Sequence, residues 1–351
     1  MIILVTGGAG FIGSNFVIEW LSKNKGSVIN LDKLTYAGNM HNLDSIKENS
    51  EHIFVHGDIG DIELVTQLLE KYKPTYIVNF AAESHVDRSI HGPEDFIQTN
   101  IVSTFHFLES VRFYWDSLKA KEKDIFRLLH VSTDEVYGSL EPNEDAFTES
   151  YCYKPNSPYS ASKASADHLV RAYNKTYGLP TLVTNCSNNY GPYQFPEKLI
   201  PLVIYNALEN KDIPIYGDGQ QIRDWLYVND HCNAICYVLE SGKIGNVYNI
   251  GGLNEKTNKN VIDAICSMLD KLRPKEDGQS YKSQIKYIKD RAGHDKRYAI
   301  DASKIKHDLA WFPIETFDSG MKKTVQWYLE NQNWVKSVAS GEYLEWVKKH
   351  Y

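Results

Sequence analysis

Short apolar runs alternate with segments of helical periodicity through the first half of the chain. Apolar runs bounded by glycine, proline or charged residues predict buried strands, and apolar positions three and four residues apart predict helices. Strands are expected at 2–6, 27–32, 52–58, 76–82, 126–133 and 181–185, and helices at 13–23, 62–72, 100–116 and 160–177. This alternation predicts an α/β fold in which helices cover both faces of a parallel sheet.

The pattern changes after residue 185. Turn-forming residues are dense at 188–196, and the polar stretch 271–283 contains a proline and a glycine, so both are expected to be loops. We therefore expect two domains. Residues 1–185 would form the sheet domain, to which a later segment near 220–250 also belongs. Residues 186–351 would form mainly a smaller mixed α/β domain that covers the sheet.

Composition narrows the class of protein. The 351 residues suggest about two domains, and 42% hydrophobic with 24% charged residues is typical of a globular protein. A net charge of -7 argues against a general nucleic-acid binder. The chain has no run of about 18 apolar residues, so no membrane span is expected. Five cysteines without disulfide or metal-site spacing favour buried thiols, no metal and a cytoplasmic location.

A glycine-rich turn joins the first predicted strand to the first predicted helix. Gly7, Gly10 and Gly13 permit a tight turn and a close approach of the backbone to a pyrophosphate, which the N-terminus of the helix would bind. Because the glycines lie between a strand and a helix, they predict a dinucleotide site on a Rossmann-type, doubly wound sheet. Phe11 and Ile12, inside the same turn, are expected to contact the cofactor.

Asp32 ends the second predicted strand, where a carboxylate can accept hydrogen bonds from the adenosine ribose and repel a 2′-phosphate. Asp32 therefore favours NAD over NADP, although the neighbouring Lys33 could contact such a phosphate. Alternatively, Asp32 caps a turn. Further cofactor contacts are expected where the third and fourth strands end, although tight packing alone would explain small residues there; these positions are Asp58, Ile59, Ala81, Ala82 and Ser84.

Tyr159 and Lys163 are four residues apart at the start of a predicted helix, so they share a face. A free tyrosine has a pKa of about 10, but a nearby ammonium and a nicotinamide cation would favour the phenolate. Tyr159 could then take a proton from a sugar hydroxyl during its oxidation, while Lys163 holds the nicotinamide ribose. Without the glycine turn, this pair would be read as an ordinary surface pair.

These motifs together resemble the extended short-chain dehydrogenase/reductases, and within them the branch that dehydrates nucleotide sugars. The resemblance covers essentially the whole chain. It rests on TGGAGFIG (6–13), NFAAESHVDRSI (79–90), HVSTDEVYG (130–138), YSASK (159–163), NNYGPYQFPEKLIP (188–201), RDWLYVNDH (223–231) and GHDKRYAID (293–301). The most specific part is Thr133-Asp134-Glu135, where sugar epimerases of this family carry small residues.

The resemblance implies oxidation at C4 of a glucosyl group, loss of water across C5 and C6, and reduction at C6. Tyr159 would be the base of the oxidation, and Thr133 would relay or position its proton. Glu135 would remove the C5 proton, and a protonated Asp134 would donate to the departing C6 hydroxyl. Neighbouring residues of a strand face opposite ways, so both carboxyls can face one substrate only if the chain begins to turn there. The alternative is a solvated pair of carboxylates.

The resemblance also implies ligands, partners and competing functions. Cofactor contacts from Thr99, Tyr159, Lys163 and Asn188 complete the NAD site. Substrate contacts are expected from Ser84, Thr133, Glu135, Asn188, Lys198, Leu199, Pro214, Tyr216, Arg223, Asn258, Arg291 and His294. Lys198 and Arg223 would neutralise the diphosphate, and Tyr216 would lie near the base. His85 is read equally as structural or catalytic.

The resemblance, not the chemistry of the residues, favours a thymidine nucleotide over a uridine nucleotide. It further implies a homodimer in which helices near 100–115 and 160–177 form a four-helix bundle. Three alternatives remain at this stage: a nucleotide-sugar 4-epimerase, a 4,6-dehydratase of another nucleotide sugar, and a non-catalytic NAD-binding protein. Asp134 and Glu135 argue against the epimerase, and the intact set of chemical groups argues against the non-catalytic protein.

Overall fold

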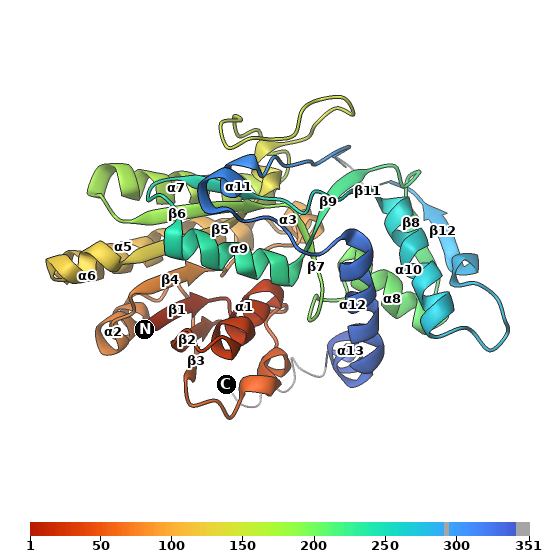
Figure 1. The fold of residues 1–351 in the computed structure, drawn as a ribbon, viewed down its shortest axis with the longest axis horizontal. Helices are drawn as coiled ribbons and strands as arrows, with labels where there is room; N and C mark the ends of the chain where they lie inside the picture. Colours follow the sequence, from red (N-terminus) through yellow and green to blue (C-terminus); the bar gives the residue numbers. More distant parts are fainter. Residues whose placement is uncertain (291–294, 342–351) are drawn as a thin grey trace.

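A computed structural model of the chain describes residues 1–290 and 295–341. Its centre is a seven-stranded sheet in which every neighbouring pair is parallel, in the order β10-β6-β5-β4-β1-β2-β3 (Figure 1). The strands are β1 (Ile2–Thr6), β2 (Ser27–Asp32), β3 (His52–His56), β4 (Tyr76–Asn79), β5 (Arg127–Thr133), β6 (Thr181–Cys186) and β10 (Val247–Ile250). The first six have the Rossmann order, which confirms the predicted fold class.

Helices cover both faces of this sheet. One face carries α2, α5 and α7, which pack on one another and on an apolar core that includes Leu108 and Val170. The other face carries α1, α9 and α11, with Phe16 and Ile235 in the core beneath them. The bounds are α1 (Phe11–Ser22), α2 (Ile62–Tyr72), α5 (Thr104–Ser117), α7 (Pro158–Tyr177), α9 (Val228–Ser241) and α11 (Ser303–Leu309).

Shorter elements connect these layers. They are η1 (Met40–Ile46), α3 (Val86–His91), α4 (Glu94–Phe96), the π-helix η2 (Ile97–Ser103), α6 (Ala120–Ile125) and the 3₁₀ helix η3 (Asp134–Tyr137). The helix predicted at 100–116 thus begins as a π-helix and becomes α-helical only at Thr104. A π-helical segment widens the turn locally and often lies beside a functional site.

A smaller α/β unit lies beyond the carboxyl ends of the sheet strands, at the right of Figure 1. Its apolar core includes Ile204, Ile265 and Val325 from three helices. It contains a three-stranded sheet, β11-β9-β7, and a two-stranded sheet, β12-β8. The elements are β7 (Asn188–Tyr190), α8 (Leu199–Leu208), β8 (Ile213–Tyr216), β9 (Ile222–Tyr227), β11 (Glu255–Thr257), α10 (Asn258–Leu272), η4 (Tyr281–Gln284), β12 (Ile285–Ile288), α12 (Phe317–Glu330) and α13 (Gln332–Ser340).

Two predicted strands end earlier in the structure than in the sequence-based prediction. β3 ends at His56 and β4 at Asn79, whereas the predicted strands continue to 58 and 82. The residues between leave the sheet at the carboxyl ends of the strands, where open parallel sheets bind their ligands. Residues 57–58 and 80–82 therefore line a cleft and do not take part in strand packing.

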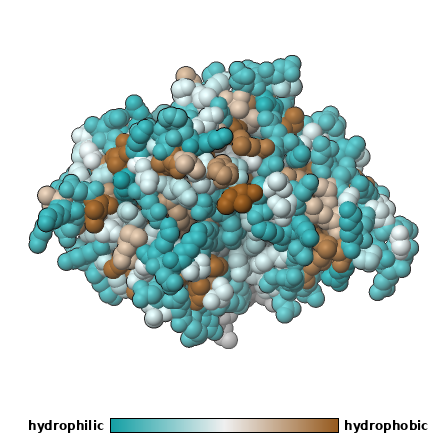
Figure 2. Space-filling view, viewed as in Figure 1, coloured by the Kyte–Doolittle hydropathy of each residue, from teal (hydrophilic) through white to brown (hydrophobic). Residues whose placement is uncertain are grey.

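The outer surface is mainly hydrophilic on the face shown in Figure 2, with apolar residues in separate small groups. Within residues 1–290 and 295–341, no helix has the length and apolar character needed to cross a membrane.

Candidate active site

One cleft runs along the carboxyl ends of the sheet strands and reaches the smaller unit. Its walls come from the loops after β1, β2, β3, β4, β5 and β6, together with the start of α7. Every residue predicted to contact the cofactor lines this cleft: Gly7, Gly10, Phe11, Ile12, Gly13, Asp32, Lys33, Asp58, Ile59, Ala81, Ala82, Ser84, Thr99, Tyr159, Lys163 and Asn188. The sheet topology therefore brings distant segments of the chain to one place.

The glycine turn forms a cradle that side chains would fill. Gly7 has φ +70°, and a Cβ there would lie 2.7 Å from the backbone nitrogen of Ala81. A Cβ on Gly13 would lie 2.2 Å from the carbonyl oxygen of Gly7. α1 begins at Phe11, so its unpaired N–H groups face the cleft, as a pyrophosphate site requires. These residues fit a bound dinucleotide.

Asp32 caps a turn, and its position in the cleft leaves room for the cofactor role expected of it. Its Oδ2 accepts a hydrogen bond from the Ala9 N–H at 2.8 Å, and its Oδ1 accepts one from the Leu34 N–H at 2.8 Å. Asp32 thus caps a turn, as the alternative held. A carboxylate can accept about four hydrogen bonds, so its oxygens, which line the cleft, can also receive ribose hydroxyls. Burial raises the pKa of Asp32, and the two N–H donors oppose that rise.

Lys33 is paired with a carboxylate. Its Nζ lies 2.7 Å from Oδ2 of Asp58, while Oδ1 of Asp58 accepts from the Gly60 N–H at 2.7 Å. Burial alone would raise the pKa of Asp58, but the Lys33 contact and the Gly60 N–H leave it lowered. Because Asp58 already balances the charge of Lys33, this lysine is a weaker argument for NADP than its position in the sequence suggests.

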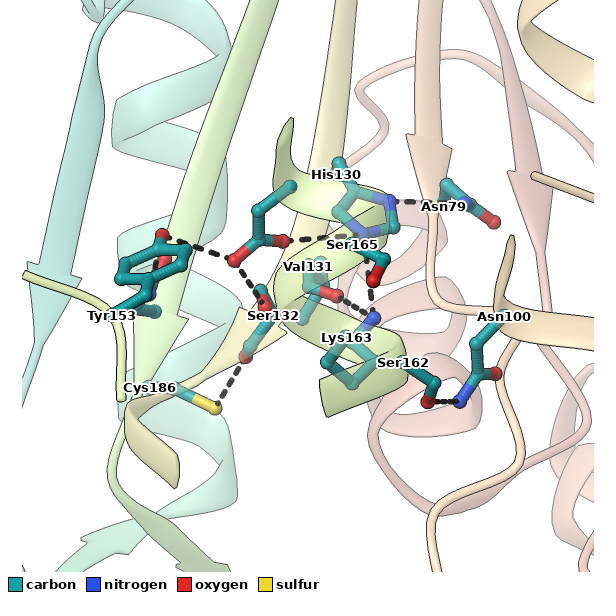
Figure 3. Close-up of polar contacts among 12 residues, drawn as sticks. Asn79, Asn100, His130, Val131, Ser132, Tyr153, Ser162, Lys163, Ser165 and Cys186 are labelled. Carbon is teal, nitrogen blue, oxygen red and sulfur yellow. Dashed lines mark hydrogen bonds and ion pairs between the residues drawn. The ribbon is translucent and has the colours of Figure 1, made fainter. Parts of the chain in front are cut away.

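The start of α7 presents Tyr159 and Lys163 to the cleft. Ser157 caps the helix through its hydroxyl, which accepts from the Ser160 N–H, and Pro158 occupies the first turn. Lys163 is only 4% exposed, and its Nζ donates to the Val131 carbonyl oxygen at 2.9 Å (Figure 3). The lysine is therefore fixed at the floor of the cleft beside β5.

In the chain without a cofactor, the surroundings of Tyr159 oppose its ionisation. Burial, followed by the nearby Glu135 and Cys186, raises the pKa of Tyr159 well above its usual value, and a hydrogen bond with Thr133 opposes the rise. The ammonium of Lys163 is directed to Val131, so it does not outweigh this environment. In the chain alone the tyrosine is a phenol, and its phenolate requires a further positive charge in the cleft.

The chain turns immediately after β5, as the two carboxyls require. β5 ends at Thr133 and the 3₁₀ helix η3 begins at Asp134, so consecutive side chains no longer alternate between faces. The Thr133 hydroxyl accepts from the Glu135 N–H at 3.3 Å and donates to Oδ1 of Asp134 at 3.4 Å. Asp134 and Glu135 both line the cleft beside Tyr159, and the alternative of a solvated pair does not hold.

Asp134 has the ionisation expected of a general acid. It is 2% exposed, and burial, followed by the charges of Glu135 and Asp224, raises its pKa well above the usual value. Its Oδ2 is buried and makes no hydrogen bond within the described part of the chain. A proton on that oxygen would be available to a substrate hydroxyl, because neither carboxyl oxygen is committed to a strong donor.

The predicted substrate residues divide into two groups. Ser84, Thr133, Glu135, Asn188 and Lys198 line the cleft, and Lys198 Nζ donates to the Ser84 carbonyl oxygen at 3.1 Å. The structure does not bring five others into its lining: Leu199, Pro214, Tyr216, Arg223 and Asn258. Arg291 and His294 lie outside the described residues.

Arg223 illustrates why the second group stays apart. Its guanidinium is buried, donating to the carbonyl oxygens of Ile222 at 2.7 Å and Asp295 at 3.0 Å and packing 4.3 Å from the ring centroid of Tyr298. Its charge instead lowers the pKa of Asp134, against the effect of burial. His85 is also occupied structurally, because its Nδ1 accepts from the Arg88 N–H at the start of α3.

Some cleft residues were missed by the sequence analysis. Cys186, the last residue of β6, and Ser187, which follows it, line the cleft, whereas the strand was predicted to end at Asn185. Glu197 also lines it, bonded to the Tyr36 hydroxyl at 3.0 Å, although it lies next to the predicted Lys198. Reading on without a gap from the end of the predicted strand through the motif at 188–201 would have found all three.

Comparison with known proteins agrees with this geometry. Residues 4–324 match the family model described as GDP-mannose 4,6 dehydratase. A dTDP-glucose 4,6-dehydratase from Xanthomonas campestris pv. campestris (strain B100) is 61% identical over 340 residues, which cover 97% of this chain and 96% of that protein. The solved structure of DesIV, a dTDP-glucose 4,6-dehydratase from Streptomyces venezuelae with NAD bound, is 44% identical at a TM-score of 0.87, covering 96% of this chain and 100% of that one.

A solved UDP-glucose 4-epimerase from Thermotoga maritima has the same fold at lower identity. It is 28% identical with a TM-score of 0.83, and the match covers 95% of this chain and 100% of that one. The parallel sheet, the glycine turn and the Tyr159–Lys163 pair define a short-chain dehydrogenase/reductase of the kind that modifies nucleotide sugars. With its Asp134–Glu135 pair and these relatives, the chain belongs to the dTDP-glucose 4,6-dehydratase family.

Proposed function

We propose that this protein converts dTDP-glucose to dTDP-4-keto-6-deoxyglucose, with NAD as its resident cofactor. The observation that carries the proposal is that Tyr159 shares one cleft with Asp134 and Glu135. Oxidation alone would need only the tyrosine, its lysine and NAD. A second acid/base pair in the same cleft fits an elimination between the oxidation and the return of reducing equivalents.

The residues of the chain divide the proton transfers among them. NAD, when bound, takes up the hydride from C4, adds positive charge to the cleft and later returns the hydride to C6. Tyr159 accepts the proton of the C4 hydroxyl, with the Thr133 hydroxyl beside it, and Lys163 keeps the cofactor ribose in place. We assign Lys163 this holding role because its buried ammonium lines the cleft.

The elimination uses the pair on η3. The C4 ketone makes the C5 hydrogen acidic, and Glu135 removes it as a proton. Asp134, which its environment keeps protonated, donates to the C6 hydroxyl, and the C6–O bond breaks to release water. After C6 is reduced, a proton returns to C5 from Glu135 and the C4 ketone remains. The reaction is redox-neutral overall, since glucose loses one water.

A 4-epimerase is the second candidate, because such an enzyme has the same fold. It would use Tyr159 and Lys163 in the same way and return the hydride to the other face of C4. Asp134 and Glu135 would then have no proton to transfer. Asp134 is a buried acid without a strong hydrogen-bond partner in the described chain, so its proton is available to a substrate hydroxyl. This favours the dehydratase.

We also propose the division of labour between the two halves. Residues 1–185, with β10 added to their sheet, would hold the cofactor, and 186–351 would supply mainly substrate contacts. Lys198 is the cation that lines the cleft from this second half and is proposed to neutralise the diphosphate. The free thiols, four buried and Cys152 exposed, support a reducing compartment such as the cytoplasm.

We further propose a homodimer through α5 and α7. The outer face of this helix layer exposes large apolar side chains, with Phe113 62% and Tyr177 48% exposed. The Arg112 guanidinium lies within 5 Å of both ring centroids, at 4.3 Å and 4.8 Å, so the two rings are neighbours. Pairing of these two helices with their copies would bury such a patch as a four-helix bundle.

Incubation with dTDP-glucose in heavy water tests the function. The dehydratase should give a product that has lost one water and gained one deuterium at C5, detected by mass spectrometry and NMR. Appearance of a galactose form without loss of water would favour the epimerase. Absence of any reaction with dTDP-glucose, but dehydration of another nucleotide sugar, would contradict the proposed substrate alone.

A further inference from the structure

A buried cluster of polar groups lies directly behind Lys163. Its members come from β4, β5 and α7, and they lie inside the sheet–helix layer, where ordinary packing would place apolar side chains (Figure 3). His130 is 2% exposed, and Asp167, one helical turn after Lys163, is 4% exposed. The catalytic scheme above uses neither residue. Buried polar groups are costly unless they are paired, so their presence calls for a function.

The hydrogen bonds fix the proton on the His130 ring. The Thr6 hydroxyl donates to Oδ1 of Asn79 at 2.5 Å, so the amide nitrogen of Asn79 faces Nδ1 of His130 at 3.1 Å. That nitrogen can only donate, so Nδ1 is the acceptor and a neutral ring carries its proton on Nε2. Burial, and then the charge of Lys163, lowers the pKa of His130 well below its usual value, so the ring is neutral.

The protonated edge of the ring lies between two charges. Of the two groups near Nε2, only Oδ1 of Asp167, at 3.6 Å, can accept its proton, because Lys163 Nζ, at 3.3 Å, is itself a donor when it is an ammonium. Oδ2 of Asp167 accepts from the Ser132 hydroxyl at 2.9 Å and from the Tyr153 hydroxyl at 3.1 Å, which hold the carboxylate in place. Oδ1 makes no hydrogen bond within the described part of the chain. This second oxygen therefore faces His130 and, beyond it, the ammonium.

We propose that Asp167 is a positioning residue of the oxidation step: its buried carboxylate is the counter-charge that keeps Lys163 an ammonium, with the His130 ring between them. The inference rests on the proposed function. A fully buried ammonium with a carbonyl oxygen as its main acceptor would lose its proton, because burial penalises the charged form. Burial does lower the pKa of Lys163, and the charge of Asp167 opposes that effect.

The two other carboxyls near the tyrosine serve the elimination and are poor substitutes. Asp134 is held protonated, and Glu135 must alternate between charged and neutral during each turnover. Asp167 is itself only just a carboxylate near neutral pH, since burial raises its pKa to about 7 against the opposing charge of Lys163. The titratable or charged groups that surround Lys163 and Asp167 are His130, Asp134, Glu135, Tyr137, Tyr153, Tyr159 and Cys186.

The test compares the holoenzyme with its Asp167→Asn variant across pH. Asparagine keeps the shape and can still contact the Ser132 and Tyr153 hydroxyls, but it has no charge. Single-turnover oxidation of dTDP-glucose is followed by NADH absorbance. We expect the alkaline limb of the oxidation rate to move to lower pH by about one unit or more, so that the rate falls by about tenfold at a pH well above the midpoint of the limb. The KM for dTDP-glucose should stay within about twofold.

Controls separate this role from a merely structural one. Asp167→Glu restores the charge and should return the limb toward its original pH, whereas damage to packing would lower the rate equally at every pH. If Asp167→Asn does not fold, as judged by circular dichroism, Asp167→Ser, which also removes the charge, replaces it, and the limb should move in the same direction. An unshifted limb in either folded variant would overturn the proposal.

A readout that needs no turnover keeps this inference distinct from the proposed function. The carbon-13 resonance of labelled Lys163, assigned with Lys163→Arg, should titrate at lower pH in Asp167→Asn than in the unmodified protein. If the unmodified protein fails to dehydrate dTDP-glucose, the proposed function is contradicted, and the lysine titration still decides the role of Asp167. Equal titration in both proteins would reject it.

Discussion

At the scale of single residues, burial distinguishes the two adjacent carboxyl groups of the cleft. Asp134 and Glu135 are adjacent in sequence and identical in chemistry, yet Asp134 is nearly inaccessible and Glu135 is partly exposed. Desolvation penalises the charged form of a carboxyl, so Asp134 keeps its proton and can act as an acid. The same effect makes Tyr159 a phenol until positive charge enters the cleft. The two acids are thus distinguished by environment and not by residue type.

Glu135→Gln should separate oxidation from elimination. Glutamine cannot accept the C5 proton, so dehydration should slow by about 10²–10⁴-fold while oxidation at C4 continues. A stopped-flow trace should then show NADH that accumulates and persists. Tyr159→Phe is the matched control, since it should slow the appearance of NADH itself. Dehydration at the unmodified rate in the glutamine variant would remove Glu135 from the mechanism.

Asp134→Asn should change how stability depends on pH. The pKa of Asp134 in the folded protein is raised above its usual 3.8, so the folded state binds this proton more tightly than the unfolded state. Its stabilising contribution is present at low pH and is lost as pH rises above 3.8 toward the folded pKa. Asparagine removes that loss. The melting temperature of the variant relative to the unmodified protein should therefore be higher at pH 8 than at pH 5.

A neutral comparison for this titration is Asp124→Asn. Asp124 is at the end of α6, away from the cleft, so its replacement should shift the melting temperature similarly at both pH values. A pH-independent difference for Asp134→Asn as well would mean that this carboxyl ionises normally in the folded protein. It would also contradict its assignment as the acid.

At the scale of elements, the loops that follow the strands make the site. β1 ends at Thr6, and its glycine turn passes against the backbone after β4, so a cofactor can approach both. β5 turns at once into η3, and α7 begins opposite with its capped first turn. Each catalytic side chain is thus placed at an element boundary, where a regular strand or helix fixes one side of the residue and a turn sets its direction.

Gly7→Ala should weaken the cofactor site. Its φ of +70° and the 2.7 Å approach to the Ala81 nitrogen would strain any side chain, so the turn must move away from β4. We expect NAD affinity to fall by at least about tenfold, for a strain of about 1–3 kcal/mol. Isothermal titration calorimetry on protein stripped of its cofactor would measure the change.

Gly278→Ala is the matched control for backbone conformation. Gly278 has φ +72°, but a Cβ added there would meet no atom within 4 Å among the described residues. The substitution should cost about 1–2 kcal/mol of stability and leave NAD affinity unchanged. Equal NAD affinity in Gly7→Ala and the unmodified protein would show that the turn does not hold the cofactor.

At the scale of the whole molecule, the sheet and the smaller unit together form the cleft. The strands end toward the smaller unit, so the cleft collects loops from six strands and the segment 186–198 (Figure 1). The proposed dimer surface lies on the helix layer of α5 and α7. Because α7 also carries Tyr159 and Lys163, an interface there would stiffen the helix that presents the base.

Phe113→Glu should disrupt the proposed dimer. Phe113 is exposed at α5 beside Arg112 and the ring of Tyr177. A glutamate there would place a charge on a surface that dimerisation must remove from water. Light scattering after size exclusion should report a dimer for the unmodified protein and a monomer for the variant. Phe312→Glu, at a similarly exposed phenylalanine outside this layer, should leave the dimer intact. A monomeric unmodified protein would contradict the proposal.

The sequence by itself determined the features that depend on local pattern. The strands at 2–6 and 27–32, the glycine turn, Asp32 and the Tyr159–Lys163 pair could be predicted because strand periodicity, turn glycines and helical spacing act over a few residues. Parallel pairing through crossover connections then places the carboxyl ends of these strands together. The resemblance to known dehydratases supplied the roles of Asp134 and Glu135.

Only the tertiary structure decided how these groups behave. It turned the chain at Asp134 so that both carboxyls face one cleft, kept Tyr159 protonated and placed Asp167 behind Lys163. It also left Asn258 and Arg223 outside the cleft lining, although Arg223 begins a motif, 223–231, that resembles the family's. Burial, and distances between residues far apart in the chain, arise from packing of whole layers. A pattern of neighbouring residues predicts which strands are buried, but it does not determine the burial of a single polar side chain or a distance between distant segments.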